Sequence, residues 1–390
     1  HMYDIIDTFC NSFKVKYMYL DKLFNGALET KNKKGKQQVE VANIYINFES
    51  LYNCARNNSV EKHLKAATTK ELSSIYRCMI SNFINVAAHY RKYFTNKKIK
   101  TRIFFYYNEI PTENMIYNNT AMVPNYRHHF MKSLKNLDLL TVSSIIQESI
   151  QFMKIITEYI DDVYMVGTNS VESSLVPFII DMNNKHPSNI NIIVSKDAYD
   201  LQYTNYNYLV ITKHKQEPIL LTKKNVMQYL IFKNKMETPK RIAHHLLVPF
   251  ILSCIGDRKR SIPGVKSFGF TRTYNALLEL YESGYLMDEA EDSISISNLT
   301  HVIKHDEVKL FSKEDLSSEL LRSYKVTDLE SQYTVLSEVQ QDTIFDQLTN
   351  RTDTEALMDI NETYFTDFPL MLVELNNYDF TNEIITEGIV

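Results

Sequence analysis

Short apolar, β-rich segments alternate with helical patterns along the first half of the chain, and this alternation limits the fold more than any other feature. The segments that indicate strands are 41–48, 101–107, 162–166, 190–195 and 207–212. Helical patterns cover residues 71–93, 141–159 and 175–182. Strands separated by helices pair in parallel and are covered on both faces. We therefore predict an α/β fold built on a parallel sheet.

Polar side chains stand just past the predicted strands or at the helix starts that follow them. They are Asn47, Tyr107, Glu172 and Asp197. Ligands of open α/β sheets bind outside the carboxyl ends of the strands, so these side chains predict a site at that edge. Asp200 lies three positions after Asp197, at a predicted helix start, where we expect its carboxylate to point elsewhere.

A second feature is a glycine cluster that precedes an amphipathic helix. Three of the eight glycines fall close together, at Gly256, Gly264 and Gly269. Lys266 and Arg272 flank the turn, and a helical pattern begins at Thr271. Glycine lets backbone N–H groups approach an anion, and a helix start adds a favourable dipole. The pattern is typical of a phosphate-binding turn, and equally of an ordinary turn between two core helices.

Bulk composition narrows the class of protein. Hydrophobic residues make up 44% and charged residues 23% of 390, as in ordinary globular proteins. The four cysteines, at 10, 54, 78 and 254, show no disulfide or metal-ligand spacing, which favours a reducing compartment. The longest apolar run, 246–255, is too short to span a bilayer. We expect a cytoplasmic protein with no membrane segment, in the host cytoplasm if it is viral.

Charge is distributed unevenly. Residues 286–390 hold 6 Lys and Arg against 23 Asp and Glu, a net charge of −17. The preceding residues hold 37 against 24, a net charge of +13. A basic body predicts a nucleic-acid partner, and the acidic end predicts a protein partner or masking of the body.

The glycine cluster also resembles a known motif. Its string resembles the helix–hairpin–helix element of the flap endonuclease and 5′-3′ exonuclease family, particularly the bacteriophage branch, where G-D-x-x-D-N-I-x-G-V-x-G-I-G is expected. The chain keeps Gly256, Asp257, Ile262, Gly264, Val265 and Gly269, and carries Arg260, Ser261 and Ser267 at three substituted positions. The resemblance extends over about residues 41–285. It implies a PIN-like α/β nuclease core with a helix–hairpin–helix clamp that holds DNA through Gly264, Val265, Lys266, Gly269 and Arg272.

The same resemblance implies a degraded metal site. Cleavage of phosphodiesters by two Mg²⁺ ions needs several carboxylates. Glu172, Asp197 and Asp257 match acids of the family, whereas Asn47 stands where an aspartate is expected. Arg260 would oppose a cation directly. The resemblance thus implies a vestigial site that holds at most one weak Mg²⁺ or Mn²⁺, with K⁺ as a further candidate at the hairpin turn.

One basic residue of the family's arch has a counterpart. The string ending in Arg127 resembles the family's P-x-Y-K, whose cation meets the scissile phosphate and the DNA strand. By this resemblance Arg127 binds DNA and, if the protein is an enzyme, serves in catalysis. A solvated basic loop is the alternative interpretation.

These observations divide the chain into four regions. They are an N-terminal helical extension with a basic connector (1–40), an α/β nuclease-like core (41–235), a helix–hairpin–helix region (236–285) and an acidic C-terminal region (286–390). We predict a protein that binds branched, nicked or double-stranded DNA by its backbone, without cleaving it, in phage or viral replication, repair or transcription. The alternatives are an active metal-dependent 5′ nuclease with an atypical site, and an assembly protein that recruits partners through residues 286–390.

Overall fold

The computed structural model describes the chain in separate stretches. They are residues 2–25, 28–32, 35–48, 62–63, 66, 69–108, 150, 153–154, 157, 162–168, 175–185, 189–214, 217–258, 260–265, 269–282, 287–288, 293–294 and 314–346.

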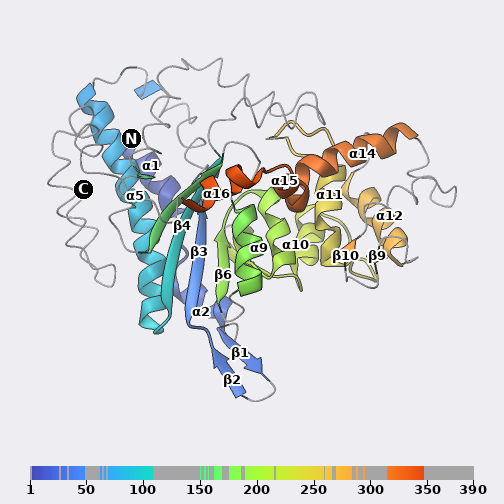
Figure 1. Ribbon diagram of the computed structural model, residues 1–390, viewed down its shortest axis with the longest axis horizontal. Coiled ribbons are helices and arrows are strands. Elements are labelled where there is room, and N and C mark those ends of the chain that lie inside the picture. The colour runs from blue at the N-terminus through green and yellow to red at the C-terminus, as the bar shows by residue number, and fades with distance from the viewer. Residues whose placement is uncertain are drawn as a thin grey trace.

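A mainly parallel sheet forms the centre of the fold (Figure 1). In the described part of the chain it has six strands in the order β5-β4-β3-β6-β7-β8. They are β3 (Val41–Asn47), β4 (Lys100–Asn108), β5 (Val163–Thr168), β6 (Ile190–Val194), β7 (Leu209–His214) and β8 (Glu217–Leu221). All neighbours pair in parallel except β7 and β8, which are antiparallel. The predicted parallel sheet is confirmed, and β8 adds an edge strand that the sequence patterns do not reveal.

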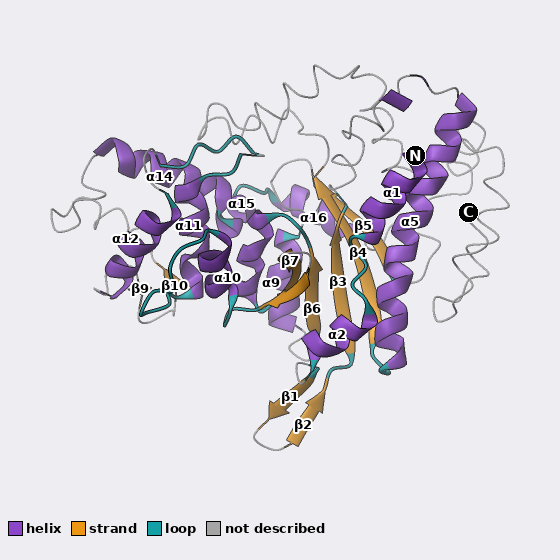
Figure 2. Cartoon of the chain, turned by 180° about the vertical axis from the view of Figure 1, so that it is seen from behind, coloured by secondary structure: helices purple, strands orange, loops and turns teal. Residues whose placement is uncertain are grey.

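Helices cover both faces of this sheet (Figure 2). One layer contains α1 (Met2–Asn11), α2 (Tyr17–Phe24) and α5 (Thr69–Asn96). The opposite layer contains α9 (Val176–Lys185), α10 (Val226–Lys233) and α11 (Val248–Ile255). Ile44 and Ile46 of β3 face the first layer, and Tyr45 faces the second. Because β3 is enclosed on both sides, its sequence is apolar along most of its length.

The N-terminal region differs from the prediction. Instead of one helix over residues 3–28, a turn separates α1 from α2, because Phe13 and Val15 are buried in the core at that point. The expected connector at 31–38 takes part in an antiparallel hairpin of β1 (Glu29–Asn32) and β2 (Gly35–Gln38). The region therefore holds strands as well as helices.

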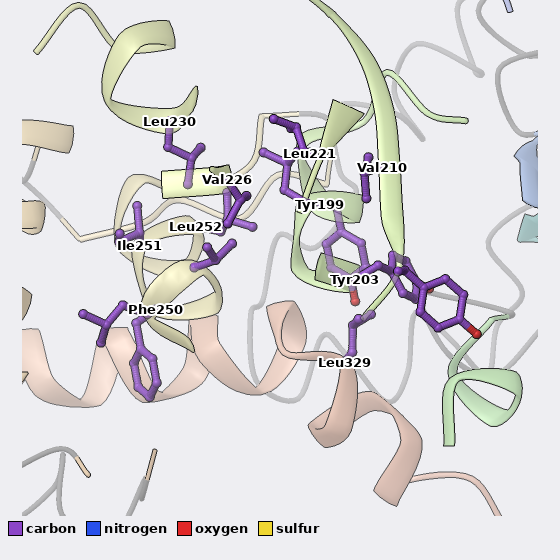
Figure 3. Packing of buried hydrophobic residues seen from close by; sticks show 14 of the residues in the cluster. Tyr199, Tyr203, Val210, Leu221, Val226, Leu230, Phe250, Ile251, Leu252 and Leu329 are labelled. Atoms are coloured by element: carbon purple, nitrogen blue, oxygen red, sulfur yellow. The ribbon is translucent and has the colours of Figure 1, made fainter. Parts of the chain in front are cut away.

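The second core joins the sheet to the later helices (Figure 3). Tyr199 and Tyr203 come from the 3₁₀ helix η1 (Ala198–Tyr206), which takes the place of the core strand considered for this tyrosine-rich run. They pack in one cluster with Phe250 of α11 and Leu329. A short 3₁₀ helix, η2 (His245–Leu247), precedes α11, and α12 (Phe270–Glu282) follows it.

Part of the acidic C-terminal region packs against this core. It contributes α14 (Glu314–Thr327), α15 (Leu329–Thr334), α16 (Glu338–Asp346) and the short strands β9 (Met287–Asp288) and β10 (Ser293–Ile294). Tyr324 stacks on Phe250 with 4.4 Å between ring centroids, and Phe345 meets the edge of Phe178 at 5.5 Å. Across the described helices, none combines the length and the apolar character that a membrane span requires.

Candidate functional site

The site predicted at the carboxyl edge of the sheet forms where three strands end side by side. Asn47 closes β3 and pairs in register with Tyr106 of β4. Ser195 follows β6, whose Val194 pairs with Ile46 of β3. These parallel pairings bring three polar side chains from distant parts of the sequence to one place. Tyr106, rather than the expected Tyr107, faces the site, because Tyr107 belongs to the core on the other face of the sheet.

Asp200 lies at the centre of this group. Its Oδ2 accepts hydrogen bonds from Ser195 Oγ at 2.5 Å and Tyr106 Oη at 2.7 Å. Asn47 Nδ2 donates to the same oxygen at 3.4 Å. The expectation that Asp200 points elsewhere is therefore wrong. The segment after β6 is a 3₁₀ helix, in which residues three apart share a side, so Asp197 and Asp200 both turn to the sheet edge.

Burial changes the acidity of Asp200. Only 3% of this residue is exposed, and burial, followed by the negative charge of Asp197, raises the pKa of Asp200 to about 6. The hydrogen bonds from Ser195 and Tyr106 act in the opposite direction, because they stabilise the carboxylate. Asp200 is thus a carboxyl group held close to its protonation midpoint at neutral pH.

A buried arginine occupies the neighbouring position. Arg260 Nη2 lies 2.7 Å from Asp197 Oδ2, and Arg260 Nη1 lies 3.2 Å from Asp197 Oδ1, a bidentate pair. Nη1 also donates to Asp257 Oδ2 at 2.6 Å. The Arg260 side chain is 2% exposed, and its guanidinium carbon lies 4.2 Å from the centre of the Tyr199 ring. One guanidinium therefore neutralises two of the three acids that match the family.

This donor set does not fit a divalent cation. Asp197 and Asp257 already bind a positive group, and Asn47 directs an N–H, not an oxygen, to Asp200. The described residues contain no group of three or more His, Cys, Asp or Glu side chains that could hold a metal. The third predicted acid, Glu172, lies outside the described residues.

The hairpin between α11 and α12 explains the glycine cluster. Asp257 and Ile262 pair as an antiparallel bridge, with both N–H···O distances at 2.9 Å. Gly264 has φ +69°, and a Cβ there would lie 2.5 Å from the Cys254 carbonyl oxygen. Glycine is required here by the close approach of two backbone segments. Val265 N donates to the same Cys254 oxygen at 2.8 Å, so the predicted use of its N–H for a phosphate is wrong.

The start of α12 lies at the surface. Gly269 and Arg272 are exposed, and no heavy atom lies within 4 Å of a Cβ built at Gly269. Arg258, in the turn of the hairpin, is exposed as well. Two further predicted DNA contacts, Lys266 and Arg127, fall outside the described residues.

Comparisons with known proteins place this fold. No protein-family model matches the chain, and no curated protein does either. The bacteriophage T5 D15 protein co-crystallised with metal ions matches with a TM-score of 0.50 at 11% identity, over 79% of this chain and 98% of that one. T5 5′-exonuclease with zinc bound matches at 0.48, 13% identity and the same coverage. A T5 D15 flap endonuclease pseudo-enzyme–product complex with DNA and metal ions matches at 0.46 and 11%, over 86% and 100%. The chain has a flap-endonuclease-like fold, as its motifs predict.

Proposed function

We propose that this protein binds the sugar–phosphate backbone of branched, nicked or double-stranded DNA and does not cleave it. The observation that carries the second half is the position of Arg260, whose guanidinium is bound by both Asp197 and Asp257. Metal-dependent cleavage needs free carboxylates at this edge to hold Mg²⁺. A cation that belongs to the chain removes that possibility and leaves the fold intact.

The first half rests on charge and exposure around the hairpin. Arg258, Gly269 and Arg272 are exposed, and the sequence adds Lys259 and Lys266 to the same connection. Backbone N–H groups and basic side chains contact phosphates without reading bases. The body's net charge of +13 supports this binding, and the shared fold with the T5 D15 protein agrees with a role in phage DNA replication, repair or transcription.

DNA binding is tested with the double variant Lys266→Ala and Arg272→Ala. Affinity for duplex and flap DNA should fall equally for all sequences, and the salt slope should become shallower by about 0.9 per lost contact. Lys22→Ala, an exposed lysine on α2, is the matched control and should bind as the wild type does. Unchanged binding by the double variant would show that this surface is not the DNA site.

Cleavage is tested with a 5′-flap substrate in Mg²⁺ and in Mn²⁺. We expect no turnover above a protein-free control. A working nuclease with atypical ligands is the second candidate, because Asp200 adds a carboxyl group beside Asp197 that the sequence motifs do not predict. Turnover that disappears in Asp197→Ala would establish that candidate instead.

A further inference from the structure

We propose that the Arg260 guanidinium is a built-in substitute for a divalent cation, and that a latent cation site lies beneath it. The site would take a hard ion such as Mg²⁺ or Mn²⁺ only when the guanidinium is removed. This inference deepens the proposed function because it concerns the same carboxylates. Its readout is cation binding, so it does not depend on whether the wild-type protein cleaves DNA.

The geometry around one nitrogen atom supports the substitution. Nη1 of Arg260 lies 2.6 Å from Asp257 Oδ2 and 3.2 Å from Asp197 Oδ1. Oxygen ligands surround Mg²⁺ at about 2.0–2.1 Å and the larger Ca²⁺ at about 2.3–2.6 Å. An ion at the place of Nη1 would therefore meet one oxygen from each carboxylate after an inward movement of about an ångström or less.

The two carboxylates are held in place independently of the guanidinium. Asp197 caps η1, since its Oδ1 accepts from Tyr199 N at 3.1 Å. Asp257 Oδ1 accepts from the backbone N of residue 260 at 3.2 Å, a contact that any side chain at that position leaves intact. Removing the guanidinium should thus leave two fixed negative groups facing one another. Two carboxylates with water completing the shell is a common arrangement for Mg²⁺.

The wild-type chain, in contrast, should ignore divalent ions at this position. Arg260 is 2% exposed, its charge is matched by two acids, and its guanidinium lies over the Tyr199 ring. An incoming ion would have to displace a buried cation that cannot lose its proton. The hairpin is therefore tied to the sheet edge by a permanent ion pair, where a metal-dependent relative would use an exchangeable ion.

The test is thermal unfolding of the full chain in EDTA, millimolar Mg²⁺ and millimolar Mn²⁺ at constant ionic strength. Arg260→Met removes the charge and keeps a side chain of comparable length. Its Tm in EDTA should fall by roughly 5–15 °C, because two buried acids lose their partner. Mn²⁺ or Mg²⁺ should recover several degrees of that loss, while the wild-type Tm stays the same in all three solutions.

The matched control combines Arg260→Met with Asp197→Asn and Asp257→Asn, which removes the proposed ligands. Its Tm should not respond to either ion. If Arg260→Met is unfolded in EDTA, circular dichroism should show refolding on addition of Mn²⁺. No ion response in Arg260→Met, or an equal response in the control or the wild type, would overturn the proposal.

Discussion

Replacing Asp200 by asparagine should stabilise the protein at neutral and alkaline pH and have little effect in acid. The carboxyl group is buried, and its Oδ2 accepts hydrogen bonds from Ser195, Tyr106 and Asn47. An asparagine carbonyl can accept the hydroxyl bonds, and Asn47 can present its own oxygen to the new amide N–H after rotation. The substitution therefore removes a charge while the hydrogen bonds can persist.

The magnitude follows from the pKa. Burial, followed by the charge of Asp197, raises the pKa of Asp200 from 3.8 to about 6. Because the folded state holds the proton more tightly, the penalty is absent below the unfolded pKa. It develops as pH rises from 3.8 to about 6, and is complete above that value. A change of one pH unit in pKa corresponds to about 1.4 kcal/mol, so ionised Asp200 costs about 3 kcal/mol of folding free energy.

Urea unfolding of the wild type and Asp200→Asn across this pH range measures the effect. The stability difference in favour of the variant should grow by about 3 kcal/mol from acid to neutral pH. Asp342→Asn, at an exposed carboxyl group on α16, is the control and should follow the wild type. A stability difference that is constant with pH would refute the reasoning, because it would show that Asp200 titrates alike in the folded and unfolded chains.

Three further predictions concern the hairpin and the acidic region. Ser261 has φ +55°, so Ser261→Gly should raise stability by about 0.5–1 kcal/mol in urea unfolding; a loss of stability would show that the serine side chain outweighs the backbone strain. Gly264→Ala should cost at least about 2 kcal/mol, since its Cβ would meet the Cys254 oxygen; near-wild-type stability would mean that the hairpin opens without cost. Glu338→Gln with Asp342→Asn neutralises exposed carboxylates of α16 and should tighten DNA binding at low salt, with a gap that closes as salt rises. Equal affinities throughout a salt titration would reject masking and favour a partner-binding role for the acidic region.

The acidic region also changes how masking must be tested. Ending the chain near residue 284 would remove α14–α16 and expose Phe250, which Tyr324 covers. Leu320 and Ile344, both buried in the same core, would be lost as well. Charge-neutralising substitutions avoid this loss of packing, so they isolate the electrostatic effect that truncation would confuse with unfolding.

The sequence was sufficient for the sheet and for the identity of the family-like motifs. Apolar, β-rich runs separated by helical periods indicate buried parallel strands, and this signal is local, so β3, β4 and β6 could be located within a few residues. Glycines at 256 and 264 could be recognised in the same way, because positive φ and close backbone contact exclude other residues. Where burial overrides periodicity, as at Phe13 and Val15, the local signal gave one helix instead of two.

The site itself was decided by tertiary structure. The sequence named Asp197, Asp257 and Arg260 but could not show that one guanidinium binds both acids, because Asp197 and Arg260 are separated by 63 positions. It also misjudged Asp200, since the choice between an α-helix and a 3₁₀ helix after β6 determines which way the third residue points. Local propensity fixes the type of each element over a few residues. The direction and charge partner of a buried side chain depend on whichever distant segments pack around it, and only the folded chain specifies them.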